Sequence, residues 1–156
     1  AGVDMEPVDL VNRLMDGVIE RVQADLPWRP GARELLAECQ SAGIRCALVT
    51  MSWRRFAEAI LIACPDGSFE VIITGDEVAH GKPHPEPYEA AARGLGVDVR
   101  ACVAIEDSRT GAASALAAGC ATLGIPHVVE LDPAQNLTIR DTLVGVTVDD
   151  LRALLA

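Results

Sequence analysis

The stretch ACVAIEDSRTGAASALAAGCATLG, residues 101–124, contains a complete strand–helix–strand pattern. Val103-Ala104-Ile105 is a short apolar run typical of a buried strand, and the Ala-rich run from Thr110 to Ala118 is typical of a helix. Gly119 suits the end of that helix, and residues 121–124 form a second apolar run. Two strands joined through a helix across short turns favour a parallel sheet with helices packed on it.

Similar apolar runs and helical segments alternate along the rest of the chain. We expect further strands at residues 44–49 and 69–74, and a last strand at Leu143–Val144. Helices are expected at residues 5–24, 30–43, 53–63, 87–92 and 148–155. The sequence therefore predicts an α/β fold with a Rossmann-like, doubly wound parallel sheet.

The composition limits the classes of function. The 156 residues include 23 acidic and 13 basic ones, a formal charge of −10, so the chain repels nucleic-acid backbones and anionic membranes. No apolar run approaches the roughly 20 residues of a membrane span. The five cysteines are odd in number and form no Cys-x-x-Cys pair, which favours reduced thiols in a cytoplasmic protein. We expect neither nucleic acid nor a membrane as a partner.

Ligands of such folds bind at the carboxyl ends of the strands, so the residues placed there matter most. Thr50-Met51-Ser52 follows the strand predicted at 44–49 and precedes a helix. A hydroxyl beside the free N–H groups of a helix N-terminus is suited to binding phosphate. The structural alternative is ordinary N-capping of that helix by Ser52.

A second candidate segment is Gly81-Lys82-Pro83-His84-Pro85, in the loop after the strand at 69–74. One glycine and two prolines within five residues restrict the backbone and hold Lys82 in one place. In an acidic protein, a lysine aimed at the strand ends would neutralise a phosphate. The alternative is a solvated surface lysine.

The third candidate segment is Glu106-Asp107-Ser108, at the exit of the strand near residue 105. Two adjacent carboxylates are the hard oxygen ligands that Mg²⁺ prefers. An N-cap at Asp107 or Ser108 is the structural alternative. Gly111 falls in the first turn of the next helix, where glycine lowers helix stability, so close packing or phosphate approach is the expected reason for it.

Four segments, taken in order and spacing, resemble the motifs of the haloacid dehalogenase superfamily of phosphatases and mutases. They are Thr50, the Gly81-Lys82-Pro83-x-Pro85 loop, the Glu106-Asp107-Ser108-x-x-Gly111 turn, and Ala117-Ala118-Gly119. Each motif alone is weak, whereas four in this order on the expected elements are specific. The Glu-Asp-Ser form is most similar to the branch that contains β-phosphoglucomutase and small sugar-phosphate phosphatases.

The resemblance implies a role for each matching residue. Lys82 and Thr50 would be catalytic, and Glu106 and Asp107 would hold Mg²⁺. The implied phosphate-binding set is Thr50, Met51, Ser52, Arg54 and Lys82, although this branch often has a small polar residue at the position of Arg54. The implied activity is hydrolysis of small phosphorylated metabolites, such as sugar phosphates, through an aspartyl-phosphate.

One motif of the family has no counterpart in the chain: no Asp-x-Asp-Gly follows an apolar strand. In the family this segment carries the nucleophilic aspartate on the central strand of the sheet. We therefore expect residues 1–26 to be the C-terminal part of a helical cap, and residues 27–156 to be a core domain without its first strand. The strands ending at Thr50 and Glu106 should then be separated by a slot that an N-terminal segment or a swapped strand fills.

Three other classes of protein share part of this pattern. A β-phosphoglucomutase-like phosphomutase uses the same motifs. A non-catalytic binding or assembly module would have no need to keep Lys82 together with both carboxylates. A receiver domain is disfavoured because its acidic residues precede its lysine. Residues 1–156 alone are expected to be inactive because they lack the nucleophile.

Overall fold

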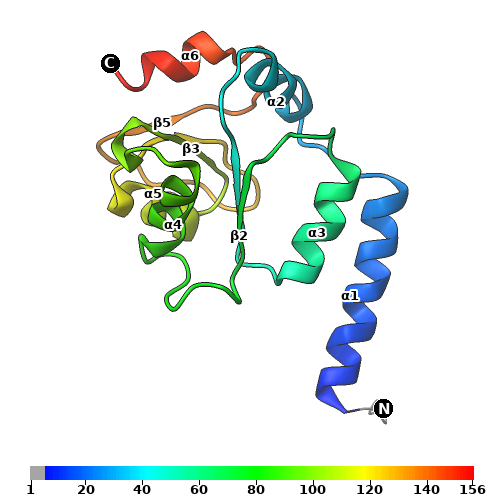
Figure 1. The fold of residues 1–156 in the computed structure, drawn as a ribbon. Helices are drawn as coiled ribbons and strands as arrows, with labels where there is room; N and C mark the ends of the chain where they lie inside the picture. The colour runs from blue at the N-terminus through cyan, green and yellow to red at the C-terminus, as the bar shows by residue number, and fades with distance from the viewer. Residues whose placement is uncertain (1–5) are drawn as a thin grey trace.

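The computed structural model describes residues 6–156 (Figure 1). Its helices are α1 (Pro7–Ala24), α2 (Ala32–Ser41), α3 (Arg54–Ala63), α4 (Glu86–Leu95), α5 (Arg109–Ala118) and α6 (Val148–Ala153), with a 3-10 turn at Val99–Ala101. Its strands are β1 (Ala47–Val49), β2 (Val71–Ile73), β3 (Val103–Glu106), β4 (Ala121–Gly124) and β5 (Leu137–Ile139). Every strand pair is parallel, which confirms the predicted α/β class. The predicted first residue of α1, Met5, lies outside the described residues.

The sheet β3–β4–β5 is covered by helices on both faces, as a doubly wound fold requires. Leu35 of α2 and Leu151 of α6 pack in one buried cluster with Leu123 of β4. Ala115 of α5 packs with Tyr88 of α4 in a second buried cluster, which also contains residues of β3. The buried face of α5 consists of glycine, alanine and serine, so this helix lies close to the sheet.

The strands β1 and β3 do not pair with each other. Within residues 6–156, β1 pairs only with β2, and β3 pairs only with β4. A cavity of about 610 Å³ lies between the two sheets, lined by apolar side chains of β1, β3, α2 and α4. Helix α4 packs against both β1 and α5 and so connects the two sheets. The expectation that the strands ending at Thr50 and Glu106 are not direct neighbours is confirmed.

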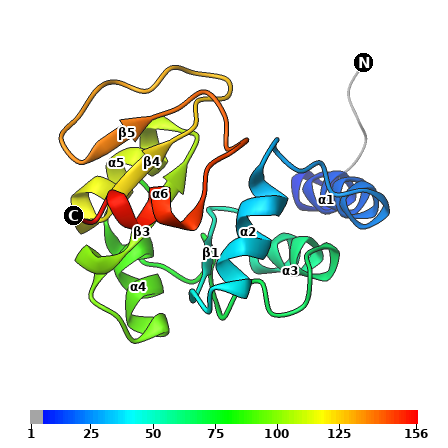
Figure 2. The ribbon, with the colours of Figure 1, turned by 90° about the horizontal axis from the view of Figure 1, so that it is seen from above.

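Helix α1 packs along α3 at the edge of the molecule (Figures 1 and 2). Arg55 of α3 forms an ion pair with Asp16 of α1. Several apolar side chains of α1 stay exposed, including Val8 and Leu14 at 69% and 63%. No helix among the described residues is both long enough and apolar enough to cross a membrane.

The prediction of a last strand at Leu143–Val144 is wrong. The last strand is β5, which pairs with β4. Leu143 instead belongs to the buried cluster around Leu123, and its backbone packs so closely on Gly31 that a side chain there would overlap it. The sequence signal misled because β5 is a half-exposed edge strand, while the apolar Leu143 fills the core from a turn.

Candidate active site at the ends of β1 and β3

Lys82 connects the end of β1 to the end of β3. Its Nζ donates to the carbonyl oxygen of Val49 at 3.1 Å and forms an ion pair with the Glu106 carboxylate. The Lys82 and Glu106 side chains are only 10% and 7% exposed. A buried ion pair of this kind persists only when its remaining polar atoms are also bonded. The lysine predicted from its Gly-Pro frame is therefore a fixed charge and not a solvated one.

Tyr88, the only tyrosine of the chain, completes this network from the first turn of α4. Its hydroxyl donates to Glu106 Oε1, and its oxygen lies 3.4 Å from Lys82 Nζ. The Nζ also lies 5.0 Å from the centre of the Tyr88 ring. Burial, followed by the adjacent Glu106 charge, raises the pKa of Tyr88, so the phenol stays a neutral donor.

The position of the Glu106 carboxylate explains why residue 111 is a glycine. A side chain at Gly111 would overlap the Glu106 carboxylate, so only glycine fits this position of α5. Ser108 caps α5 by accepting from the Gly111 N–H at 3.1 Å, and its hydroxyl lies 3.4 Å from Glu106 Oε2. Close packing at Gly111 is therefore confirmed, and the N-cap is Ser108 and not Asp107.

Asp107 differs from its neighbour Glu106 because its side chain is 54% exposed. Its nearest basic group is Arg29 Nη1, at 3.8 Å. Arg29 lies in the linker between α1 and α2 and donates from Nη2 to the carbonyl oxygen of Pro126 at 3.1 Å, while its buried Nη1 has no hydrogen bond. The Asp107 carboxylate is thus open to a cation, and one of its sides is next to a fixed guanidinium.

The loop after β1 fits against the loop that carries Lys82. The Lys82 N–H donates to Met51 Sδ at 3.2 Å, and a side chain at Gly81 would come within 2.9 Å of the same sulfur. Within the first loop, the Ser52 N–H donates to Thr50 Oγ1 at 3.1 Å. The predicted residues Thr50, Met51 and Lys82 therefore belong to one packed unit.

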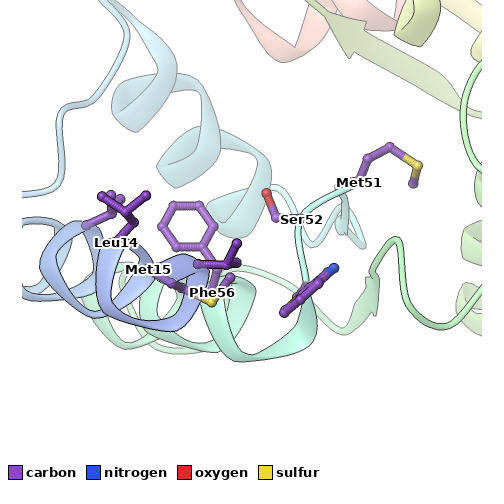
Figure 3. Close-up of a pocket in the computed structure, with 8 residues that line it drawn as sticks. Leu14, Met15, Met51, Ser52 and Phe56 are labelled. Carbon is purple, nitrogen blue, oxygen red and sulfur yellow. The ribbon is translucent and has the colours of Figure 1, made fainter. Parts of the chain in front are cut away.

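Ser52 does not cap α3. The N-cap of α3 is Trp53, which makes no side-chain capping bond. Ser52 instead lines an open groove of about 360 Å³ between α1 and α3, together with Trp53 and Met51. Figure 3 shows Leu14 and Met15 of α1 beside Phe56 of α3 in this groove, with Ser52 at the end of it. The predicted phosphate loop thus borders an apolar groove.

Arg54 lies in a separate network. Its guanidinium binds the Glu77 carboxylate and lies 3.3 Å from the carbonyl oxygen of Ile72. The backbone N–H of Arg54 donates to Asp76 Oδ1 at 3.1 Å. The structure therefore brings Thr50, Met51, Lys82, Glu106 and Asp107 to the ends of β1 and β3, whereas the Arg54 guanidinium is directed to the segment after β2.

Two residues of the site were not predicted from the sequence. Tyr88 has a usable signal, since a lone tyrosine lies six residues after Lys82 in the first turn of the next helix. Arg29 carries no such signal, because its place beside Asp107 depends on how the linker before α2 crosses the end of β4.

Comparison with known proteins gives a consistent family. Residues 5–119 match the haloacid dehalogenase-like hydrolase family. The protein CbbY of Rhodobacter capsulatus is 47% identical over 94 residues, which are 58% of this chain and 41% of that protein. Hexitol phosphatase B of Escherichia coli is 32% identical over 119 residues, covering 76% of this chain and 54% of that one. The chain thus spans about half the length of these curated relatives.

A solved structure agrees with the sequence comparison. The crystal structure of CbbY from Rhodobacter sphaeroides in complex with phosphate superposes with a TM-score of 0.82 at 30% identity. The superposition covers 97% of this chain and 71% of that one. A variant of the same protein was solved with xylulose-(1,5)bisphosphate. With its fold, its strand-end residues and these matches, the chain belongs to the haloacid dehalogenase-like hydrolases.

Proposed function

We propose that this chain supplies the phosphate-orienting and magnesium-binding part of a phosphatase that acts on small phosphomonoesters, with sugar phosphates as the leading class. The observation that carries the proposal is the position of Lys82. Its ammonium is held between Val49 at the end of β1 and Glu106 at the end of β3. A fixed cation at this point stabilises the charge that develops on a phosphoryl group during transfer.

The other residues follow from their geometry. Thr50, Met51 and Ser52 form the loop beside Lys82 and would orient the phosphate through hydroxyl and N–H groups. The exposed Asp107 carboxylate would bind Mg²⁺ directly. Glu106 is bonded to Lys82 and Tyr88 and would stabilise the metal site from its buried side. Bound Mg²⁺ would neutralise phosphoryl oxygens. Arg54 would contribute indirectly, by fixing the segment after β2.

The nucleophile requires a further strand. We place a strand with an aspartate at its end in the cavity between β1 and β3, supplied by a segment outside residues 1–156. Within residues 6–156, β1 and β3 each leave one edge unpaired, and these edges together with an apolar cavity of about 610 Å³ support this placement. The aspartate carboxylate would attack phosphorus and break its bond to the substrate oxygen, which would take a proton from a second, acid–base aspartate of the same segment. That second aspartate would then take a proton from water, which attacks the aspartyl-phosphate, releases inorganic phosphate and restores the first carboxylate. Residues 1–26 would be cap and residues 27–156 core.

The substrate class rests on the relatives. Hexitol phosphatase B and the xylulose-(1,5)bisphosphate complex of CbbY both concern phosphorylated sugars. The apolar groove between α1 and α3 borders the phosphate loop and would contact the part of the substrate beyond the phosphate. Trp53, at 51% exposure, is the largest side chain available there for stacking on a sugar.

The test compares residues 1–156 with a longer polypeptide product, which includes the sequence encoded upstream of Ala1. Phosphate release is measured on a panel of metabolite phosphates, with Mg²⁺ and after chelation. We expect magnesium-dependent release from sugar phosphates by the longer product only. Activity of residues 1–156 alone would overturn the strand proposal. A longer product without phosphatase activity on any small phosphomonoester would overturn the proposed function.

A further inference from the structure

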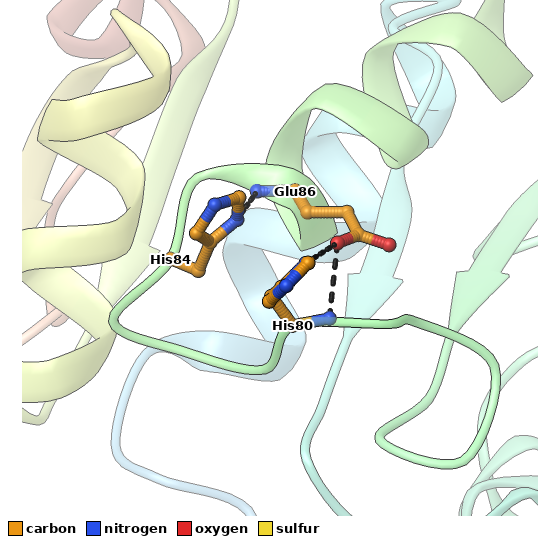
Figure 4. Close-up of side chains that lie close together, drawn as sticks. All are labelled: His80, His84 and Glu86. Atoms are coloured by element: carbon orange, nitrogen blue, oxygen red, sulfur yellow. Dashed lines mark hydrogen bonds and ion pairs between the residues drawn. The ribbon is translucent and has the colours of Figure 1, made fainter.

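A second cluster of chemically active side chains lies on the loop between β2 and α4, away from the strand-end network. It consists of His80, His84 and Glu86 (Figure 4). One ligand atom of each side chain lies within 4.8 Å of those of the other two. Among the described residues, the side chains of His80, His84 and Glu86 make no hydrogen bond or ion pair with Lys82, Glu106 or Asp107, so their convergence needs its own explanation.

The three side chains are close together and partly accessible. His80 Nδ1 lies 2.9 Å from Glu86 Oε2, and the two imidazole rings stack with their centres 4.6 Å apart. His84 Nδ1 accepts from the Glu86 N–H at 3.2 Å. The His80 and Glu86 side chains are 65% and 25% exposed, so an ion can reach the cluster from solvent.

The backbone of the loop holds the carboxylate of the cluster in place. The N–H groups of Ala79 and His80 donate to the two oxygens of Glu86 at 2.8 and 3.0 Å. The loop backbone is fixed as well, because the fully buried Ser114 donates from Oγ to the His84 carbonyl oxygen at 2.6 Å.

We propose that His80, His84 and Glu86 form a binding site for a divalent transition metal of the zinc class. Two imidazoles and one carboxylate are a common ligand set for such ions, whereas Mg²⁺ prefers oxygen ligands alone. In a tetrahedral site with bonds of about 2.0–2.1 Å, ligand atoms lie about 3.3 Å apart. The present separations are at most 4.8 Å, so the side chains would move closer together when an ion binds. Water would complete the coordination.

The position of the site links it to the rest of the loop. His80 and His84 stand on either side of Lys82 in the sequence, and the Lys82 side chain is paired with Glu106. A metal bound by both histidines would clamp the two sides of the loop that presents the lysine. This inference does not depend on the phosphatase proposal, because it requires only metal binding.

The experiment follows the imidazole proton resonances of tag-free protein by NMR during a Zn²⁺ titration. Residues 1–156 contain three histidines, and His127 lies outside the cluster, so it serves as an internal control. Single variants H80A, H84A and H127A assign the resonances. We expect those of His80 and His84 to shift together and to saturate at one equivalent, while those of His127 stay in place.

Calorimetric Zn²⁺ titration of the same variants gives the affinity. We expect H80A, H84A and E86Q each to weaken binding at least about tenfold, and H127A to leave it unchanged. The D107N variant should keep the site, which separates it from the proposed magnesium ligands. Two outcomes overturn the proposal: equal affinity in wild type, H80A and H84A, as for binding by cysteine thiolates, or no Zn²⁺ response of His80 and His84.

Discussion

Two ion-pair networks flank the loop after β1, and they differ in burial. The inner network joins Lys82 to Glu106, Tyr88 and Val49, and its two charged side chains are 10% and 7% exposed. The outer network joins Arg54 to Glu77 and Asp76, and the Arg54 and Glu77 side chains are 33% and 40% exposed. Buried ion pairs are costly to break, whereas exposed pairs contribute little to stability.

The networks also differ in what they connect. The outer network ties the start of α3 to the segment after β2, and β2 already pairs with β1. The inner network is the polar link between β1 and β3, which share no ladder among residues 6–156. The inner network therefore joins two strands that share no ladder, and the outer network joins the start of a helix to a neighbouring loop.

The largest effect is expected for Lys82→Ala. Removing the ammonium leaves the buried Glu106 carboxylate unpaired, which should lower the free energy of unfolding by about 3–5 kcal/mol. In the complete enzyme, loss of one preorganised cation should also cost about 2–4 kcal/mol of transition-state stabilisation. Urea unfolding and kcat/KM on a sugar phosphate measure the two effects.

Lys82→Arg is the matched control for charge. A planar guanidinium does not fit the point contact with Val49 and Glu106, so activity should not return. Full kcat/KM in either variant would show that Lys82 is only a structural residue.

The next effect is expected for Asp107→Asn, and it should fall mainly on activity. Asp107 is half exposed, and its ion pair with Arg29 at 3.8 Å is a surface pair, so the free energy of unfolding should change by no more than about 1 kcal/mol. Loss of the metal carboxylate should remove most magnesium-dependent phosphate release. Asp149→Asn, an exposed acid on α6, is the control and should act as wild type. Wild-type activity of Asp107→Asn would refute the metal assignment.

A smaller effect is expected for Tyr88→Phe, which keeps the ring and removes the hydroxyl bond to Glu106. A hydrogen bond to a charged group is worth about 1.5–3 kcal/mol, and unfolding should show this loss. Because the pKa of Tyr88 is raised in the folded protein, the stability that the neutral phenol contributes is fully present below about pH 10. It is lost as the pH rises above that value. The variant should therefore lose less stability than wild type between neutral and strongly alkaline pH. Equal alkaline slopes would contradict the buried phenol.

Sequence patterns pointed to the charged residues at the strand ends better than to the residues that contact them. Lys82, Glu106 and Asp107 were found because prolines, glycines and paired acids at strand ends have few other uses. The partners Val49 and Arg29 were not found, because a carbonyl oxygen and a linker side chain leave no pattern. The edge strand β5 was missed for a related reason: it is half exposed, and burial is what produces an apolar run.

The smallest effect is expected for Arg54→Ala, and it decides between two roles for this residue. The sequence suggested a phosphate contact, whereas the structure pairs the guanidinium with Glu77. An exposed pair should contribute no more than about 1 kcal/mol to stability, reduced further by salt. A guanidinium that stays with Glu77 makes no transition-state contact, so kcat/KM should change by less than about threefold. The hydrogen bond from Arg54, followed by that from Thr74, lowers the pKa of Glu77. The stability from this pair is therefore present at neutral pH and is lost as the pH falls through the lowered pKa.

Glu77→Gln is the matched variant: it should remove the same acid-sensitive stability and leave kcat/KM unchanged. If Arg54→Ala lowered kcat/KM as far as Lys82→Ala while Glu77→Gln did not, Arg54 would reach the phosphate during turnover, and the outer network would belong to the active site.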